Sequence, residues 1–180
     1  MRYFFLMASG RREALVLGAV GLAAGVAGAL AGVLALQSRS GAAELLAAKF
    51  TDLEGRPRRL LDWQGRALLC NFWATWCAPC REEIPLLVAA KQQSLASSVE
   101  IVGIAIDSAD KIRQFAEMYK INYPLLVADA TALNLLRGLG NRTGGLPYTV
   151  ALDRNGALAE RHLGALKESE LRQVLARLRG

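Results

Sequence analysis

The sequence predicts an α/β domain, with helices covering a mixed central β-sheet, that follows a single membrane-spanning helix. Beyond about residue 45, apolar runs typical of buried strands alternate with segments of helical spacing, in the order β-α-β-α and then β-β-α. Before that point, the 23 residues Ala14–Leu36 include no charged or strongly polar side chain. A chain of 180 residues is long enough for one such domain with a sizeable core and this appendage.

The apolar run Ala14–Leu36 has the length of a membrane anchor. As a helix it would extend about 34 Å, and the hydrocarbon core of a bilayer is about 30 Å thick. Arg2, Arg11 and Arg12 precede the run, whereas only Arg39 follows it closely. Because positive charge favours the cytoplasmic side, we expect the α/β domain to lie outside the cytoplasmic membrane.

A cleavable signal peptide is the alternative for the same segment. Small residues at Ser40-Gly41-Ala42 resemble a cleavage site, but the apolar run exceeds the roughly 7–15 residues of a signal peptide. We therefore expect an uncleaved, single-pass anchor. The expected organisation is a cytoplasmic tail over 1–13, the transmembrane anchor over 14–36, a linker over 37–44 and the α/β domain over 45–180.

Glycines recur on one face of the expected anchor. Gly21-xxx-Gly25 and Gly28-xxx-Gly32 have the spacing that lets two membrane helices approach closely, so a weak helix–helix dimer is one interpretation. An anchor rich in alanine and glycine produces the same spacing by composition alone, and this alternative stays open.

Charge and cysteine content exclude several classes of function. Half of the net charge of +6 lies in the first 40 residues, and the α/β domain has no dense Lys/Arg run with interleaved aromatic residues. Nucleic-acid binding is therefore not supported. Three cysteines and one histidine are too few for a Cys/His metal centre or a disulfide-dense scaffold, and we expect no metal.

The first half of the α/β domain alternates strands and helices. Lys49–Leu61 predicts a β-hairpin that turns at Glu54-Gly55. The nearly unbroken apolar runs Ala67–Trp73 and Val99–Ile106 predict two strands buried on both faces. A helix from Pro79 to about Leu95 connects these two strands.

The second half ends in a β-β-α unit. The remaining predicted elements are helices at Asp110–Met118, Ala132–Leu139 and about Lys167–Leu178, and strands at Leu125–Ala128, Tyr148–Leu152 and Ala157–Leu163. The last two strands flank Asp153-Arg154-Asn155-Gly156, whose Asn-Gly pair is typical of a hairpin turn.

A pair of cysteines, Cys77 and Cys80, lies where the strand ending at Trp73 gives way to a helix. A cysteine at a helix N-terminus faces the positive end of the helix dipole, which lowers the pKa of its thiol. The second cysteine lies one turn further along, close enough to form a disulfide with the first. We therefore expect Cys77 to attack a partner disulfide and Cys80 to resolve the mixed disulfide. Pro79 is tolerated because the first helical turn loses no hydrogen bond there.

Other uses of the cysteines fit less well. Half a zinc site lacks further ligands, and haem attachment would require histidine after Cys80, where this chain has Arg81. A thiol peroxidase would have Thr or Ser three residues before its reactive cysteine, where this chain has Ala74. Cys70, inside a buried strand, is expected to be an inert core cysteine.

The segment from Asn71 to Pro85, NFWATWCAPCREEIP, is similar to the active-site segment of membrane-anchored thioredoxin-like thiol-disulfide oxidoreductases of the TlpA/ResA family. The similarity covers about residues 48–178 and includes Val102–Asp107 and Leu152–Gly156. The resemblance implies a thioredoxin fold with an N-terminal β-hairpin and an αβ insertion at about Ala109–Ala128. It also implies periplasmic thiol–disulfide exchange, usually reductive, with no cofactor beyond the redox-active disulfide itself.

The resemblance implies partners and supporting residues as well. The partners would be protein disulfide substrates, such as apocytochrome c or copper-site cysteines of terminal oxidases, and a membrane thiol-disulfide electron donor. Pro147 resembles the family's cis-proline, which packs beside the disulfide, and Leu146 would offer its backbone to the substrate chain. Trp76 would shield the disulfide or contact substrate, with core packing as the alternative.

Two positions depart from the family pattern. Asn71 stands where thioredoxins have a buried aspartate, so that proton acceptor is missing, and Ala78 stands where ResA-like members often have an acidic residue. Both changes affect the thiol pKa and the reduction potential. We expect Glu82 and Glu83 to be solvated acids that favour the dipole of the helix.

Three functions compete for this domain. A disulfide reductase is the leading interpretation, and a disulfide oxidase or isomerase of the same fold differs from it in reduction potential. A non-catalytic Cu(I)-binding module, with the two thiolates as soft ligands, is the third, although the chain offers no cluster of methionines or additional histidines.

Overall fold

The structure is a computed structural model, which describes residues 28–33, 36, 41–93 and 99–179. The chain divides into two units, Met1–Gln37 and Ser38–Gly180. The expected cytoplasmic tail, most of the expected anchor and the glycines Gly21 and Gly25 lie outside the described residues. Residues 28–33 are helical, and within the described ranges no helix is both long and apolar enough to cross a membrane.

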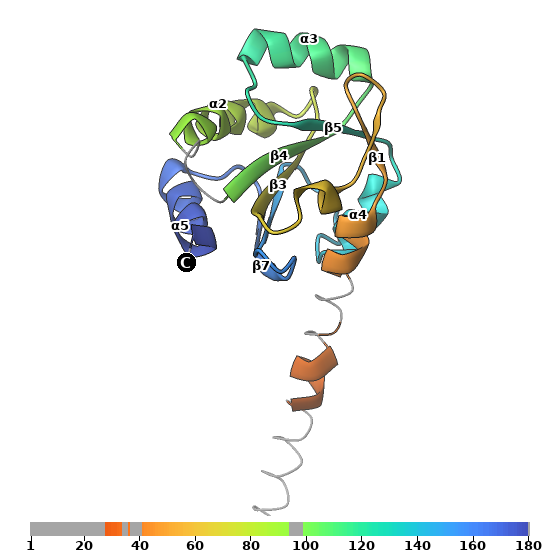
Figure 1. Cartoon of the computed structure of the whole chain (residues 1–180), viewed down its shortest axis with the longest axis vertical. Coiled ribbons are helices and arrows are strands. Elements are labelled where there is room, and N and C mark those ends of the chain that lie inside the picture. The colour runs from red at the N-terminus through yellow and green to blue at the C-terminus, as the bar shows by residue number, and fades with distance from the viewer. Residues whose placement is uncertain (1–27, 34–35, 37–40, 94–98, 180) are drawn as a thin grey trace, which may run out of the picture. The chain divides into compact units, whose positions relative to one another are not determined.

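A seven-stranded mixed sheet forms the centre of the second unit, in the order β2-β1-β5-β4-β3-β6-β7 (Figure 1). The strands are β1 (Phe50–Asp52), β2 (Pro57–Arg58), β3 (Ala67–Trp73), β4 (Val99–Ile106), β5 (Leu125–Ala128), β6 (Tyr148–Leu152) and β7 (Leu158–Leu163). β3, β4 and β5 are parallel to one another, whereas the outer pairs are antiparallel. β3 is buried along its whole length, which explains its continuous apolar sequence.

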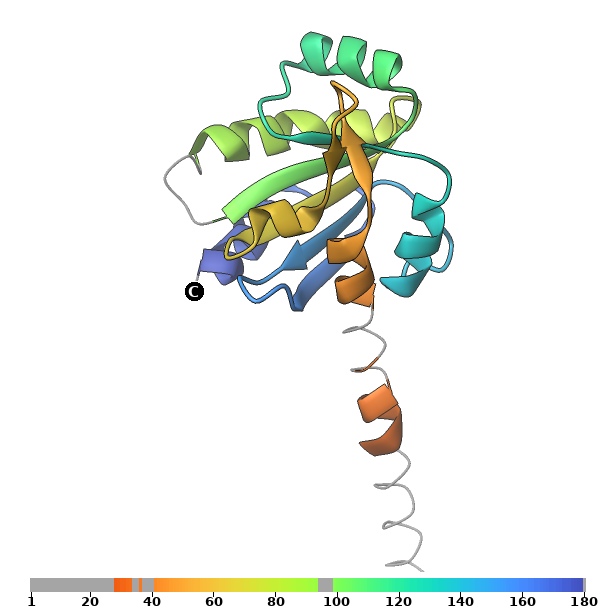
Figure 2. The same cartoon turned by 45° about the vertical axis from the view of Figure 1, so that its right-hand side comes forward.

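Helices cover both faces of this sheet (Figures 1 and 2). They are α2 (Ala78–Gln93), α3 (Ala109–Tyr119), α4 (Ala132–Gly138) and α5 (Glu168–Arg179), with a short 3₁₀ helix, η1 (Leu60–Trp63). α2, α3 and α5 share one core with Trp73 of β3, and α4, η1 and the helical residues 41–47 share the other with Phe72. Because successive side chains of a strand point to opposite faces, Phe72 and Trp73 belong to different cores.

The ends of the predicted helices and strands from residue 67 onward agree with the observed ones to within about one residue wherever they are described, whereas the predicted hairpin Lys49–Leu61 ends at Arg58 and its last two residues lie in η1. The expected hairpin is present as β1 and β2, and Gly55 takes the positive φ of 78° that its turn requires. The expected αβ insertion corresponds to α3 and β5, and β5 lies beside β4 in the sheet. Without this insertion, the N-terminal hairpin and η1, the order β3-α2-β4-α4-β6-β7-α5 remains, which is that of the thioredoxin fold implied by the resemblance.

Residues 41–44 of the expected linker over 37–44 belong to the folded domain, whereas 37–40 lie outside the described residues. Residues 41–47 are helical, and Ala42 and Leu45 are buried in the core that contains α4. Ala42, Leu45 and Leu46 recur at helical spacing, which gives this segment an apolar face to bury. Gly41 lies against α4, since a Cβ atom there would come within 2.4 Å of the carbonyl oxygen of Gly138. The folded domain therefore includes residues 41–44, which the prediction assigned to the linker.

Candidate active site

The Cys77–Cys80 segment lies at the carboxyl end of β3, where the chain turns into α2. The backbone N–H of Cys77 donates a hydrogen bond to Ala74 O at 3.2 Å, which closes a tight turn between strand and helix. The carbonyl of Cys77 then accepts the N–H of Arg81 at 3.3 Å, so Cys77 caps the first turn of α2. The carboxyl ends of parallel strands are where open α/β sheets bind their ligands.

The two cysteines form a disulfide, with 2.04 Å between the sulfurs and 5.3 Å between the Cα atoms. Cys77 keeps 6% of its surface exposed, whereas Cys80 is fully buried. Pro79, between them, is exposed in the first turn of α2. Of the two cysteines, only Cys77 therefore keeps any surface exposed to solvent.

A cis peptide bond between Leu146 and Pro147 lies at the same end of the sheet. β6 begins at Tyr148 and pairs antiparallel with β3, with Tyr148 opposite Phe72. One step further in this register places Pro147 opposite Trp73, at the strand end from which the cysteine segment departs. Pro147 is buried, and the half-buried Leu146 packs against the core that contains both cysteines.

Side chains and backbone groups hold the cis-proline loop in place. The buried Asn141 donates from Nδ2 to Gly145 O at 2.8 Å, and the N–H of Gly164 donates to Pro147 O at 2.9 Å. Leu163 lies beside this loop, since a Cβ atom at Gly145 would be 3.1 Å from its Cδ1. The loop is thus anchored to the end of β7.

Trp76 has 67% of its surface exposed, directly before Cys77. Core packing, the alternative for this side chain, is therefore wrong. Leu163 is another large exposed apolar side chain, next to the cis-proline loop. Exposed aromatic and aliphatic groups of this kind are typical of surfaces that bind other proteins.

Glu83 is buried, and the expectation that it is solvated was wrong. Only 1% of its surface is exposed. The N–H of Leu166 donates to its Oε1 and the amide of Asn71 donates to its Oε2, both at 3.2 Å. Burial raises the pKa of Glu83 to about 7, although both hydrogen bonds act to lower it. Glu82, in contrast, is exposed as expected.

The position of Glu83 on α2 explains its burial. Cys80, Glu83, Ile84 and Leu87 recur at the spacing of one helical face, and the other three are fully buried. The sequence therefore contained a signal for this residue, because it occupies a core position of an amphipathic helix. A carboxyl group with a pKa near neutrality, one turn from Cys80, can accept or release a proton there.

Cys70 lies apart from the cysteine pair. It is fully buried in the core on the α4 face, whereas Cys77 and Cys80 belong to the core on the α2 face. Burial raises the pKa of the Cys70 thiol to about 12, so this thiol stays protonated at neutral pH.

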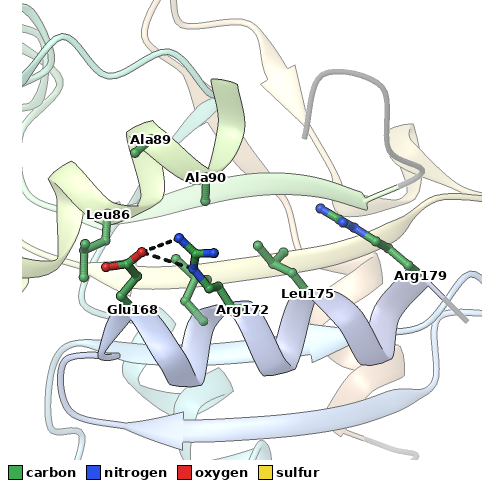
Figure 3. A pocket seen from close by; sticks show the side chains of 8 residues that line it. Leu86, Ala89, Ala90, Glu168, Arg172, Leu175 and Arg179 are labelled. Atoms are coloured by element: carbon green, nitrogen blue, oxygen red, sulfur yellow. Dashed lines mark hydrogen bonds and ion pairs between the residues drawn. The ribbon is translucent and has the colours of Figure 1, made fainter. Parts of the chain in front are cut away.

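A surface hollow of about 300 Å³ lies between α2 and α5 (Figure 3). Its lining residues are Leu86, Ala89, Ala90, Glu168, Leu171, Arg172, Leu175 and Arg179. Figure 3 shows Arg172 paired with Glu168, with the side chains of Leu86, Ala90 and Leu175 beside the pair. None of the expected site residues lines this hollow. In the part of the chain that the structure describes, no group of three or more His, Cys, Asp or Glu side chains is arranged to hold a metal ion.

Comparison with known proteins agrees with this geometry. Residues 42–161 match the AhpC/TSA family. The thioredoxin-like protein YneN of Bacillus subtilis is 33% identical over 127 residues, which are 68% of this chain and 71% of YneN. The thiol-disulfide oxidoreductase ResA of Geobacillus thermodenitrificans is 29% identical over 126 residues, 69% of this chain and 70% of ResA.

A solved structure shows the same fold. The thiol:disulfide interchange protein of Chlorobium tepidum superposes with a TM-score of 0.63 at 25% identity, over 74% of this chain and 93% of that one. With its mixed sheet, its strand-to-helix cysteine segment and these relatives, the chain belongs to the AhpC/TSA family, in the group of thioredoxin-like thiol-disulfide oxidoreductases that includes ResA.

Proposed function

We propose that the protein reduces disulfides in partner proteins, with Cys77 as the attacking cysteine and Cys80 as the resolving one. The observation that carries this proposal is the Cys77–Cys80 disulfide at the start of α2, in which Cys77 keeps some exposed surface and Cys80 is fully buried. The start of a helix favours the thiolate of Cys77, which is the nucleophilic form. The cis peptide at Pro147 lies at the same end of the sheet, where a substrate chain would bind.

The reaction proceeds by two exchanges of sulfur partners. The Cys77 thiolate attacks one sulfur of the substrate disulfide, whose S–S bond breaks as the first substrate thiolate leaves. The thiolate of Cys80 then attacks the Cys77 sulfur of the mixed disulfide, which releases the second substrate thiolate and forms the Cys77–Cys80 disulfide. Two electrons pass to the substrate, and a thiol donor restores the reduced pair with two electrons.

The second exchange needs a proton acceptor, because Cys80 is fully buried. Burial disfavours a thiolate, so the Cys80 thiol has to lose its proton to a nearby group as it attacks. Glu83 lies one helical turn from Cys80 and has a pKa of about 7. We assign this proton transfer to Glu83, which takes the place of the buried aspartate that the sequence lacks at Asn71.

The proposal includes a location and classes of partner. The run Ala14–Leu36 and the arginines before it support a membrane anchor with the catalytic domain on the extracytoplasmic side, where protein disulfides persist. The substrates in this proposal are protein disulfides of the apocytochrome c or oxidase copper-site type, and the electrons come from a membrane thiol-disulfide donor. The exposed Trp76 and the half-buried Leu146 supply an apolar surface for such a polypeptide.

Two cysteine variants of the full-length protein test the mechanism. The substrate is a disulfide-bonded peptide with the spacing Cys-x-x-Cys-His, and the reduced protein is mixed with it under anaerobic conditions. We expect Cys77→Ser to reduce no peptide, and Cys80→Ser to accumulate a mixed disulfide whose mass is that of the protein plus one peptide. Full activity in Cys77→Ser would contradict the mechanism. Stoichiometric Cu(I) binding by wild type, without any exchange, would replace the proposal by the copper-binding alternative.

A further inference from the structure

Thr75 and Asp107 meet at the carboxyl edge of the parallel strands β3 and β4. The register of these strands places Trp73 opposite Ala105, so two residues further along each chain Thr75 stands opposite Asp107. The hydroxyl of Thr75 donates a hydrogen bond to Oδ2 of Asp107. This contact links the chain that leaves β3 for the cysteine segment to the end of the neighbouring strand.

Asp107 is a fixed acceptor for this hydrogen bond. Its side chain is 8% exposed, its Oδ1 accepts the N–H of Ser108 at 2.8 Å, and the Nζ of Lys111 lies 3.4 Å from the same oxygen. Burial opposes ionisation, but the hydrogen bonds from Thr75 and Ser108 and the charge of Lys111 outweigh it and lower the pKa of Asp107. The residue is therefore ionised at neutral pH, and a hydrogen bond to a carboxylate is stronger than one to a neutral acceptor.

The turn that Asp107 anchors is the one that presents Cys77. Thr75 and Trp76 are the two central residues of this turn, which the hydrogen bond from Cys77 N to Ala74 O closes. Trp76 is largely exposed and contributes little packing, whereas Thr75 is bonded to the body of the domain. A hydroxyl has a single proton, and here it is donated to Asp107, so it is not available to a thiolate at Cys77.

We propose that Thr75 and Asp107 are a positioning pair for Cys77. The hydrogen bond between Thr75 and Asp107 holds the turn in the conformation in which the Cys77 sulfur approaches a substrate disulfide in line. The inference deepens the proposed function and rests on it. Neither residue takes part in the chemistry; both act through the turn. Effective positioning of reacting groups is worth a large rate factor, and a displacement of about 1 Å can cost about 10²-fold.

The test compares second-order rate constants for reduction of the Cys-x-x-Cys-His peptide disulfide by the full-length protein. Thr75→Val keeps the β-branched shape but lacks the hydroxyl, and we expect a loss of about tenfold. Thr75→Ser keeps the hydroxyl and should stay within about twofold of wild type. Asp107→Ala should lose as much as Thr75→Val, and the double variant should lose no more than either, because both remove one interaction.

Lys111→Gln is the matched control. It removes the neighbouring charge but leaves the hydrogen bond between Thr75 and Asp107, so its rate should equal that of wild type. Unfolding midpoints of all variants are measured in parallel, and the rates are compared at a temperature where every variant is folded. A purely structural role would lower the midpoint of Thr75→Val without changing the rate of the folded protein.

Alkylation of reduced Cys77 by iodoacetamide across pH separates positioning from activation of the thiol. We expect the same Cys77 pKa in wild type and Thr75→Val. A raised Cys77 pKa in Thr75→Val would show that the hydroxyl stabilises the thiolate instead, and would overturn the proposal. Equal peptide reduction rates for Thr75→Val and wild type would also overturn it, as would a Thr75→Ser variant as slow as Thr75→Val.

If wild type itself reduces no peptide, the proposed function fails. The rates of the variants are then compared in the reverse reaction, in which oxidised protein oxidises the reduced peptide. The positioning pair predicts the same tenfold difference there, and equal rates would overturn it.

Discussion

Two buried glutamates, Glu83 on α2 and Glu100 on the neighbouring strand β4, have opposite surroundings. Glu83, 1% exposed, accepts hydrogen bonds only from neutral groups among its identified contacts, the Leu166 N–H and the Asn71 amide. Glu100, 4% exposed on β4, meets two cations: the Nζ of Lys91 contacts its Oε1, and Nη1 of Arg66 lies 2.9 Å from its Oε2.

The difference separates a carboxylate that holds the fold together from one that can move a proton. Glu100 lies near the amino end of β4, where its cations join α2 and the start of β3 to this strand. Glu83 lies near Cys80, towards the end of α2 opposite to Lys91. Among the described residues no cation pairs with it, and burial raises its pKa to about 7. The charge of the neighbours therefore decides which role a buried glutamate has.

The largest effect is expected from breaking the ion pair of Glu100. Lys91→Met leaves the buried Glu100 carboxylate with Arg66 as its remaining identified cation, and the Arg66 side chain is largely exposed. We therefore expect this variant to lower the free energy of unfolding by about 3–5 kcal/mol. Urea unfolding at pH 7 measures this loss. The matched control is Arg172→Met, which removes an exposed pair with Glu168 and should cost less than about 1 kcal/mol. Equal losses of unfolding free energy in the two variants would show that the ion pair of Glu100 does not stabilise the fold more than an exposed pair does.

The next effect concerns Glu83 and depends on pH. Its pKa is raised from 4.5 to about 7 in the folded protein, and each unit corresponds to about 1.4 kcal/mol. The neutral carboxyl group is favoured by folding, so its contribution to stability is fully present below about pH 4.5 and is lost as the pH rises through 7. Relative to Glu83→Gln, which does not titrate, wild type should lose about 3 kcal/mol of unfolding free energy over this range.

Urea unfolding of oxidised wild type and Glu83→Gln at a series of pH values measures this difference. A gap between the two proteins that does not change from pH 4.5 to pH 8 would contradict a raised pKa for Glu83.

A smaller effect is expected at Asn71. Asn71→Ala removes the amide that donates to Oε2 of Glu83, and this hydrogen bond favours the ionised carboxylate. The pKa of Glu83 should therefore rise further, by about one unit, since a hydrogen bond to a charged group is worth about 1.5–3 kcal/mol before the site relaxes. Titration of the Glu83 carboxyl carbon by NMR measures the change. An unchanged or lowered pKa would mean that Asn71 does not set the acidity of this group.

The fold was largely predictable because its central strands are unusual in sequence. The runs ALLCNFW and VEIVGIAI are buried on nearly every residue, so they lack the alternation of an exposed strand and stand out as central. Cys77 and Cys80 were predictable for a similar reason, because a Cys-x-x-Cys between such a strand and a helix has few alternatives.

Glu83 and the contact of Thr75 with Asp107 were harder to predict. An acid in the first turns of a helix usually faces solvent and interacts favourably with the helix dipole. This general rule led to the wrong prediction that Glu83 is solvated, although Glu83 occupies a core position. Asn71 was interpreted as the loss of a proton acceptor, whereas it donates a hydrogen bond to an acceptor supplied by α2. The pairing of Thr75 with Asp107 depends on the register of β3 and β4, which sequence spacing does not determine.

The reduction potential of the Cys77–Cys80 pair tests the proposed reductase function most directly. Full-length protein is equilibrated in dithiothreitol buffers of known potential, and the fraction of free thiols at Cys77 and Cys80 is measured by alkylation and mass spectrometry. Cys70 is a buried free cysteine that would add a third thiol to the count. The measurement is therefore made on the Cys70→Ala variant, in which only Cys77 and Cys80 can be alkylated. We expect a value below about −200 mV, towards the value of thioredoxin near −270 mV. A value near about −120 mV, typical of a strong disulfide oxidant, would contradict it.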